Sequence, residues 1–387
     1  MQKYNFMLKQ QEIFFDFLRF CIGSAKEMPS SLKEADWKEL YAIAQKQALL
    51  GVLFYGIRRL SKELAPEQKL LMQWMAMAEM IRKQNIKLFQ DSVKVCQNFE
   101  NEGFANCILK GQGNALLYPE PYMRTPGDID IYLSGGRRKI MKYVDQVCPN
   151  QVMRYHHVDF PVMKTAIEVH FTPSYMFCPI HNQRMQKWFE EVMGEQCNHR
   201  VSLPDGFGEI YVPQVSFNVI YILSHLYRHI FTEGIGLRQL LDYYFVLVKW
   251  HTDLTNLTDS NNSLPQMTQI NTDLDALRHV LKYLGLWKFA GAVMFVMKEV
   301  YGLTEDRMIA PTDENEGRFL LDEIMRGGNF GQYDDRMGSK VGESKIHRYF
   351  RMNLRNLRFV KHYPTEALSE PLFRTWFAVW KKIHGIK

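Results

Sequence analysis

Two aspartates separated by one residue are the feature of this sequence best able to do chemistry. Asp128 and Asp130 lie in a segment where acidic and apolar side chains alternate, Asp128-Ile129-Asp130-Ile131. Because successive side chains of a strand point to opposite faces, this pattern predicts a strand over residues 128–133 with both carboxylates on one face. Neighbouring carboxylates repel each other unless a cation lies between them. Such hard oxygen ligands favour Mg²⁺ or Mn²⁺.

A glycine-containing turn precedes the aspartates. Residues 107–109 are apolar and predict a short buried strand, and the following Lys110-Gly111-Gln112-Gly113 predicts a tight turn into a short helix. A strand, a turn and a helix N-terminus together are a common place for anions to bind. We expect Gly111 and Gly113 to permit the backbone shape, with amides able to face phosphate oxygens. Lys110 would add positive charge for a phosphate, with a simple exposed lysine as the alternative.

A third acid, Glu168, lies in the segment Ile167-Glu168-Val169-His170. Residues 155–162 and 165–171 predict a hairpin around Met163-Lys164, with Glu168 and His170 on the same face of its second strand. Glu168 can approach the aspartates only if this hairpin lies next to the strand over 128–133, and we predict that adjacency. His170 would then position Glu168 or serve as its hydrogen-bond partner.

These parts resemble the signatures of the DNA polymerase beta-like nucleotidyltransferase superfamily: the Gly111-Gln112 turn, the Asp128-Ile129-Asp130 strand and the isolated Glu168. Within it, the chain most resembles a bacterial family described only as uncharacterised nucleotidyltransferases. That family's pattern is an apolar-Lys-Gly turn, an Arg shortly before Asp-x-Asp, and a Glu-x-His strand, which Lys110, Arg124 and His170 complete here. The chain departs from the wider superfamily at Gln112, where a serine is common.

The resemblance implies an α+β fold: a polymerase beta-like core, made of a small mixed sheet with helices, flanked by N- and C-terminal helical regions. It also implies Mg²⁺- or Mn²⁺-dependent transfer of a nucleoside monophosphate from a nucleoside triphosphate to a hydroxyl, with release of pyrophosphate. Asp128 and Asp130 would hold one metal ion and share a second, which Glu168 would complete while orienting the acceptor hydroxyl or taking its proton. The structural alternative is two solvated strand-end acids and an unrelated buried glutamate.

The sequence does not identify the acceptor, since a small molecule, the end of a tRNA and a protein hydroxyl all fit. Two other functions stay open. One is a toxin-like transferase acting on tRNA or protein, which growth arrest on expression, lost in Asp130→Ala, would favour. The other is a catalytically idle module that only binds nucleotide or metal, which tight nucleotide binding without pyrophosphate release would favour.

Three further polar residues have both a chemical and a structural interpretation. Arg124 either contacts phosphate or acceptor, or pairs with Asp128 or a local carbonyl to shape the turn. His225 and His229 lie four residues apart on a predicted helix. That spacing suits a metal site, but the glutamate of the metalloprotease signature is missing, so we favour a packed helix.

Composition indicates a folded protein. The 387 residues are 46% apolar and 13% aromatic, enough for two or three compact units with a substantial core. A net charge of +6 permits a polyanionic partner without requiring one. No stretch predicts an export signal or a membrane span, so we expect a cytoplasmic protein.

The six cysteines have no CxxC pair, which favours free thiols in a reducing compartment. They are Cys21, Cys96, Cys107, Cys148, Cys178 and Cys197. Cys178 with His181, and Cys197 with His199, could form a zinc site, but the second spacing is tight for one and we do not favour it.

Hydrophobic periodicity divides the chain into three predicted regions. Residues 1–102 predict a helical N-terminal arm, with a long helix that starts at Pro66. Residues 103–200 predict the catalytic core, including an amphipathic helix over 137–146. Residues 201–387 predict a helical C-terminal region.

The C-terminal region carries three further predictions. Arg238 and Asp242, at helical spacing, predict an ion pair. Residues 252–273 are rich in Asn, Ser and Thr and predict a surface loop. Residues 345–361 predict an amphipathic helix that packs its apolar face on the core and leaves a solvated basic face, available to a polyanion if it faces the cleft. The basic positions are Arg348, Arg351, Arg355 and Arg358, and the apolar ones are Ile346, Phe350, Leu354, Leu357 and Val360.

Overall fold

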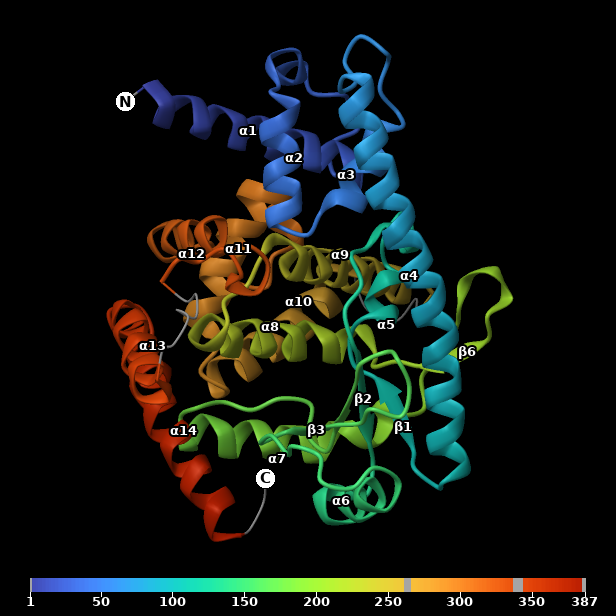
Figure 1. Cartoon of the computed structure of the whole chain (residues 1–387), viewed down its shortest axis with the longest axis vertical. Coiled ribbons are helices and arrows are strands. Elements are labelled where there is room, and N and C mark those ends of the chain that lie inside the picture. Colours follow the sequence, from blue (N-terminus) through green and yellow to red (C-terminus); the bar gives the residue numbers. More distant parts are fainter. Residues whose placement is uncertain (1, 261–265, 337–343, 385–387) are drawn as a thin grey trace.

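Helices surround a small mixed sheet in the computed structural model, which describes residues 2–260, 266–336 and 344–384 (Figure 1). This arrangement confirms the predicted α+β class. The first helices are α1 (Gln2–Ile22), α2 (Trp37–Lys46), α3 (Leu50–Ile57), α4 (Gln68–Asn101), α5 (Gln112–Ala115), α6 (Gly136–Val147) and α7 (Pro179–Gln196). The later ones are α8 (Val215–Thr232), α9 (Leu237–Ser260), α10 (Gln266–Tyr283), α11 (Trp287–Tyr301), α12 (Glu314–Gly327), α13 (Lys345–Val360) and α14 (Pro364–Ile383).

The N-terminal region is helical, as predicted. α4 begins two residues after Pro66 and runs along one side of the molecule beside the sheet (Figure 1). It ends where Gly103 takes a φ of 74°, the left-handed conformation that commonly stops a helix. Asn85, buried within α4, donates hydrogen bonds of 2.8 Å to the carbonyls of Tyr122 and Arg124. α4 therefore holds the segment that leads into the aspartate strand.

The sheet contains four strands in the order β1-β2-β4-β3. They are β1 (Asn106–Ile108), β2 (Ile129–Leu133), β3 (His157–Asp159) and β4 (Ile167–His170), and β5 (Arg200–Ser202) with β6 (Glu209–Tyr211) forms a separate hairpin. β2 runs parallel to β4, while β1 and β3 are antiparallel to their neighbours. Both the predicted hairpin, β3 with β4, and its adjacency to the aspartate strand are confirmed.

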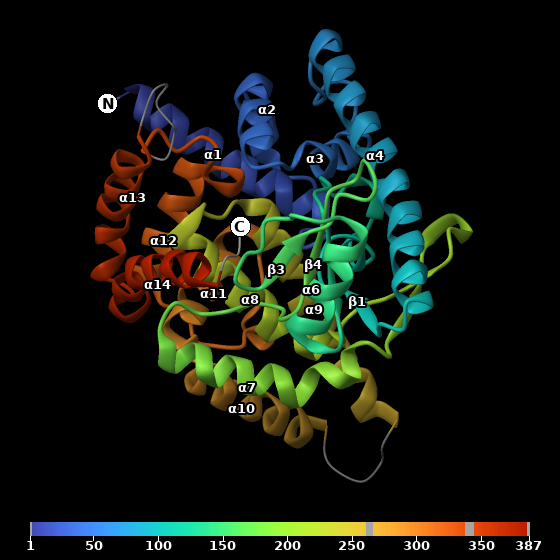
Figure 2. The ribbon, with the colours of Figure 1, turned by 60° about the horizontal axis from the view of Figure 1, so that its bottom comes forward.

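The prediction of a surface loop over residues 252–273 is wrong for the residues of this segment that the structure describes. α9 continues to Ser260 and α10 begins at Gln266. The hydroxyl of Thr252 donates to the carbonyl of Val248 at 2.9 Å, so it bonds within its own helix. Figure 2 shows α7 and α10 side by side, where Arg184 donates to the carbonyl of Tyr283 at 2.9 Å.

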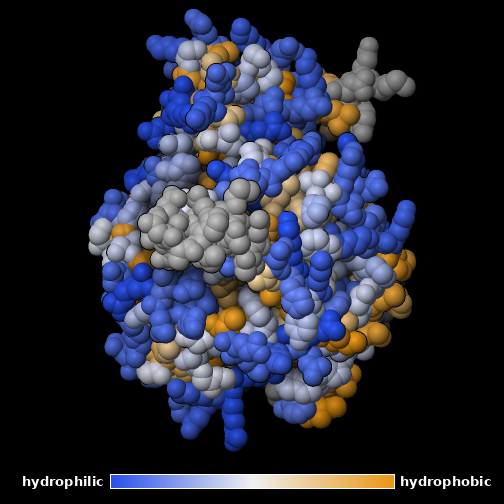
Figure 3. Space-filling model, turned by 180° about the vertical axis from the view of Figure 1, so that it is seen from behind, coloured by the Kyte–Doolittle hydropathy of each residue, from blue (hydrophilic) through white to orange (hydrophobic). Residues whose placement is uncertain are grey.

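The predicted orientation of the helix over 345–361 is also wrong. Arg355 of α13 is only 7% exposed and Arg358 pairs with Glu323, whereas Phe350, Leu354 and Leu357 are 60% exposed or more. Carboxylates from distant segments turn the arginine face of the helix toward the interior. The attraction between each arginine and a buried carboxylate offsets the cost of removing both charges from water. Ile346 and Arg348 have side chains outside those the structure describes. Figure 3 shows apolar surface along the edge that carries α13 and α14.

Buried apolar side chains form two clusters. One lies around the four-stranded sheet and includes Ile129, Ile131 and Val169, the strand residues that point away from the aspartates. The other joins the N-terminal helices to α8, α9 and α11. The division of the chain into three regions stays a prediction. Among the described helices, none has the length and apolar character that crossing a bilayer requires.

The six cysteines are free thiols. Cys178 and His181 lie next to Glu366, whose carboxylate accepts the backbone N–H groups of Phe177 and Cys178 at the start of α7. Cys197 instead contacts Cys107. The groups of possible metal ligands in the described part of the chain therefore do not unite the four residues of the zinc alternative.

Candidate active site

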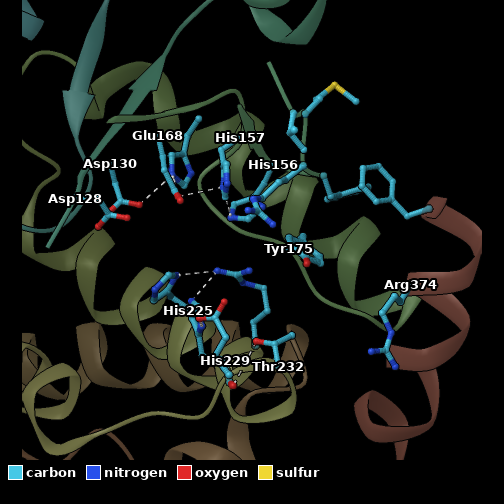
Figure 4. Close-up of a pocket in the computed structure, with 18 of the residues that line it drawn as sticks. Asp128, Asp130, His156, His157, Glu168, Tyr175, His225, His229, Thr232 and Arg374 are labelled. Carbon is cyan, nitrogen blue, oxygen red and sulfur yellow. Dashed lines mark hydrogen bonds and ion pairs between the residues drawn. The ribbon is translucent and has the colours of Figure 1, made fainter. Parts of the chain in front are cut away.

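The three predicted acids lie on one face of the sheet because of the pairing between β2 and β4. Asp130 is the direct register partner of Glu168 in this parallel pair, so their side chains leave the sheet on the same side. Asp128 precedes Asp130 by two residues and extends from that side as well. Figure 4 shows the three carboxylates together at one end of a cavity.

The cavity has a volume of about 890 Å³ and is bounded by the sheet, α8 and α14. The imidazoles of His225 and His229 on α8 lie across it from the carboxylates (Figure 4). A second cavity of about 230 Å³ adjoins the first. The residues that line both are Lys110, Asp128, Asp130, His225 and Phe330. The aspartates are thus accessible from two sides.

Asp130 is buried, with 3% of its surface exposed, and two basic side chains, those of Lys110 and His170, contact it. The Lys110 ammonium lies 2.9 Å from Asp130 Oδ1, and His170 Nε2 lies 3.1 Å from the same oxygen. Burial alone would raise the pKa of Asp130, but Lys110 and His170 outweigh it and hold the pKa well below its usual range. Asp130 is therefore a carboxylate at neutral pH.

Asp128 is in the opposite situation. The negative charge of Asp130, together with burial, raises the pKa of Asp128 to about 6. Lys110 opposes this shift only in part. Without a cation between them, the two aspartates therefore carry an electrostatic cost at neutral pH that a bound divalent ion would relieve.

Asp128→Asn is accordingly expected to stabilise the metal-free protein. The pKa of Asp128 is higher in the folded chain, about 6, than its ordinary value of 3.8, so ionisation opposes folding. The penalty is complete above pH 6 and disappears as the pH falls towards 4. Thermal unfolding in EDTA should show a gain of about 2–4 °C at pH 7.5 and none near pH 4.

Asp275→Asn, at a surface position on α10, is the matched control for that measurement. An equal gain for Asp128→Asn at both pH values would show that the gain does not come from the charge of Asp128.

The cavity also contains histidines whose role the sequence analysis missed. His157 lies opposite His170 in the β3–β4 register, and its Nδ1 is 3.3 Å from Glu168 Oε2. Burial and the neighbouring His170 lower the pKa of His157 to about 2, so it is neutral. Burial also lowers the pKa of His170, but its contacts with Asp130 and Glu168 outweigh this and raise it. His156 lies beside both rings.

A signal for His157 was present in the sequence. A hairpin centred between Met163 and Lys164 pairs residues whose numbers lie symmetrically about that centre, which places His157 opposite His170. The structure has this register. The predicted turn therefore already implied that His157 would lie near Glu168.

α8 contributes the positive side of the cavity. His225 Nε2 lies 3.2 Å from Lys110 Nζ, and Arg228 lies between His225 and His229, 2.9 Å from the ring of the latter. Burial, followed by the charges of Lys110 and nearby groups, lowers the pKa of His225, so this imidazole is neutral. The helix is packed, as favoured from sequence, and in addition it lines the candidate site.

Arg124 is buried and lines the smaller cavity, and its ion-pair partner is Asp242 in place of the predicted Asp128 or local carbonyl, while its contact with phosphate or acceptor stays a prediction. Its guanidinium makes two 2.8 Å hydrogen bonds to the carboxylate of Asp242 on α9, which also accepts a bond of 2.7 Å from the Tyr118 hydroxyl. The prediction that Asp242 pairs with Arg238 is wrong, since among the described contacts the ion-pair partner of Asp242 is Arg124. Arg124 thus joins the loop before β2 to the C-terminal helices.

Comparison with protein-family models gives a match over residues 33–287, more than half of the chain, to the family described as uncharacterised nucleotidyltransferase. The chain belongs to this family. Comparisons with curated proteins and with solved structures give no significant match. The family match supports nucleotidyl transfer as the general activity.

The nucleotidyltransferase match covers the sheet, the aspartates, Glu168 and α8, but it ends before α13 and α14. α14 nevertheless lines the larger cavity through Arg374, Phe377, Ala378, Lys381 and Lys382. One wall of the candidate site therefore comes from a segment outside the matched region.

Gly111 and Gly113 shape the turn of this nucleotidyltransferase in different ways. Gly111 has φ 57° and ψ −111°, a conformation that side chains oppose, and a β-carbon there would lie 3.5 Å from the carbonyl oxygen of Asp128. At Gly113 a β-carbon would come within 2.8 Å of Val212. The amide of Gly113 already donates to the carbonyl of Lys110 at 3.2 Å. Its contact with a phosphate stays a prediction.

Gly111→Ala is expected to destabilise the fold by about 1–3 kcal/mol, because alanine cannot adopt this conformation without strain. Chemical denaturation measures the change in unfolding free energy. Gly127→Ala is the control, since a β-carbon at Gly127 has no neighbour within 4 Å and this residue keeps an ordinary φ. Equal effects of the two substitutions would show that the positive φ of Gly111 is not the cause of the lost stability.

The donor set fits a divalent metal ion. Asp130 Oδ1 and Glu168 Oε2 belong to one group of potential ligand atoms, and Asp128, with its raised pKa, lies beside it. The oxygen-rich composition suits Mg²⁺ or Mn²⁺. Asp130 and Glu168 are thus close enough to share one ion, and a role of Asp128 as a further ligand stays a prediction.

Proposed function

We propose that the protein is a metal-dependent nucleotidyltransferase that joins the nucleoside monophosphate of a nucleoside triphosphate to a hydroxyl group and releases pyrophosphate. Asp128, Asp130 and Glu168 would hold the Mg²⁺ or Mn²⁺ ions. When bound, such ions neutralise phosphate charge and favour ionisation of the attacking hydroxyl. The observation that supports this best is the β2–β4 register, in which Asp130 is paired with Glu168. Both residues line the larger cavity, and Asp130 lines the smaller one as well.

Glu168 acts on the acceptor. The acceptor oxygen forms a bond to the α-phosphorus, the bond from that phosphorus to the oxygen bridging to the β-phosphate breaks, and pyrophosphate leaves. Glu168, which is partly exposed to the cavity, orients the acceptor hydroxyl and takes its proton. His157, 3.3 Å from Glu168 Oε2, holds that carboxylate in place.

Lys110 acts on the donor. In the metal-free chain its ammonium pairs with Asp130 at 2.9 Å and lies at the junction of the two cavities. Once Asp130 serves as a metal ligand, Lys110 can contact a phosphate oxygen instead. Because the aspartates are reached from both cavities, donor and acceptor can approach them from different sides.

The larger cavity has a basic lining that suits an anionic group. Arg154, Arg228 and Lys381 line it together with the three acids. Burial, with the charge of Arg154, lowers the pKa of Lys381, so these two cations are close enough to influence each other. This lining is compatible with a triphosphate or with an acceptor that itself carries phosphate.

Titration of the four nucleoside triphosphates into the protein, with and without Mg²⁺, tests the proposal. We expect wild type to bind at least one of them only with Mg²⁺, and the Asp128→Asn/Asp130→Asn double variant to lose that binding. Asp275→Asn serves as the control and should bind like wild type. Absence of binding of all four to folded wild type would contradict the proposal and favour an idle interaction module.

A further inference from the structure

One imidazole nitrogen in the site faces two carboxylate oxygens. His170 Nε2 lies 3.1 Å from Asp130 Oδ1, within hydrogen-bond distance, and 3.6 Å from Glu168 Oε2. The three residues form one group of possible metal ligands. They come from neighbouring positions of two paired strands, so the sheet fixes the positions of their backbones. His170 is 1% exposed and Asp130 is 3% exposed.

The distances within this group match those between ligands of one metal ion. Two atoms at right angles around an ion that is about 2.1 Å from each are about 3.0 Å apart, and around a tetrahedral ion they are about 3.4 Å apart. The separations of 3.1 and 3.6 Å in the structure lie close to these values. The side chains therefore need little movement to bind an ion.

The surroundings contain additional unsatisfied nitrogen atoms. Within the described structure, the buried ring atoms His156 Nδ1, His157 Nε2 and His170 Nδ1 have no hydrogen-bond partner. The three rings themselves form a second group of potential ligands. An imidazole-rich pocket of this kind is unusual beside carboxylates that need only bind Mg²⁺, an ion that prefers oxygen ligands.

We propose that Asp130 Oδ1, Glu168 Oε2 and His170 Nε2 form a mixed carboxylate and imidazole site that selects a transition-metal ion such as Mn²⁺ or Zn²⁺ over Mg²⁺. Imidazole nitrogen is a good ligand for Zn²⁺. Mn²⁺ accepts a mixed set of nitrogen and oxygen ligands, whereas Mg²⁺ requires near-ideal octahedral geometry and prefers oxygen ligands and water. His170 is then a metal ligand, and His157 positions Glu168 through their 3.3 Å contact. Lys110, which shares Asp130 Oδ1 with His170, leaves that oxygen when the ion binds.

This inference rests on the proposed function in that both use Asp130 and Glu168, but it can be tested without nucleotide or turnover. Mn²⁺ is added to the metal-free protein, and electron spin-echo modulation reports whether a ¹⁴N nucleus is bonded to the ion. We expect nitrogen modulation in wild type. In a folded His170→Asn variant the modulation should disappear, and the preference for Mn²⁺ over Mg²⁺ in competition titrations should fall about tenfold or more.

His229→Asn is the matched control, because His229 lines the same cavity but contacts Arg228 and Glu233, not the carboxylates of the site. It should keep the nitrogen modulation. If His170→Asn fails to fold, nitrogen modulation that persists in both His156→Asn and His157→Asn would still support the assignment to His170, since these rings form the neighbouring group of possible ligands. Bound Mn²⁺ without nitrogen modulation would overturn this inference and leave the proposed function intact. Nitrogen-bonded Mn²⁺ in a protein that binds no nucleoside triphosphate would overturn the proposed function alone.

Discussion

Glu168→Gln is expected to lower pyrophosphate release about a hundredfold to a thousandfold while the Mg²⁺-dependent binding of the nucleoside triphosphate persists. The glutamine keeps the size of the side chain but cannot take a proton, and general-base catalysis contributes an effect of this size. Asp128 and Asp130 remain to bind the donor. The measurement pairs a nucleotide titration with a pyrophosphate assay, using a cell extract that supports wild-type turnover.

Glu209→Gln is the control for this substitution, because Glu209 is exposed on β6 and pairs with Arg200. Its turnover should equal that of wild type. If Glu168→Gln lost donor binding as severely as the aspartate double variant does, the assignment of Glu168 to the acceptor would be wrong.

The second large effect concerns stability. Arg124→Ala is expected to reduce the free energy of unfolding by about 3–5 kcal/mol, because it leaves the carboxylate of Asp242 buried without its cation. Asp242 is 6% exposed and Arg124 3% exposed, and their two hydrogen bonds join the loop before β2 to α9. Denaturant unfolding measures the loss.

The charge dependence of this pair can be tested separately. The double variant Arg124→Met/Asp242→Leu should lose much less stability than either single change, because it removes both buried charges. Arg278→Ala, at an exposed pair with Asp275, should cost no more than about 1 kcal/mol. A double variant as unstable as Arg124→Ala would indicate lost packing instead of an uncompensated charge.

The ion pair between Arg124 and Asp242 also makes the stability of the protein depend on pH. Burial raises the pKa of Asp242, but Arg124 outweighs it and the net pKa is lowered. A lowered pKa in the folded chain contributes stability that is present above the ordinary pKa and lost as the pH falls below about 4. Wild type should therefore lose more stability in acid than Arg124→Ala does.

Local patterns predicted the arrangement of the three acids on the sheet correctly. Alternation along residues 128–133 placed both aspartates on one face, and the hairpin about Met163-Lys164 placed Glu168 and His170 on one face of the next strand. Glu168 could approach the aspartates only if the hairpin lay next to the aspartate strand, and the pairing of β2 with β4 shows that it does. These predictions succeeded because strand periodicity and a short turn depend on residues near each other in sequence.

Features that depend on distant residues were not predictable in this way. Arg124 pairs with Asp242 across more than a hundred residues. No local pattern distinguishes this pair from the two predicted ones, Arg238 with Asp242 and Arg124 with Asp128. The orientation of α13 depends on Glu323 and Asp334, two acids in segments that precede it. A helical wheel shows that two faces differ, but it does not show which face meets a buried carboxylate.

Transfer of radioactive label shows whether the protein moves the nucleoside monophosphate of its donor to an acceptor. Metal-loaded protein is incubated with a cell extract and the nucleoside triphosphate that it binds, labelled with ³²P at either the α or the γ position. Relative to the extract alone, we expect the protein to attach the α label to an acceptor and to release the γ label in pyrophosphate, and we expect neither change with the Asp128→Asn/Asp130→Asn variant. Attachment of the γ label, or transfer that persists in that variant, would contradict the proposed function.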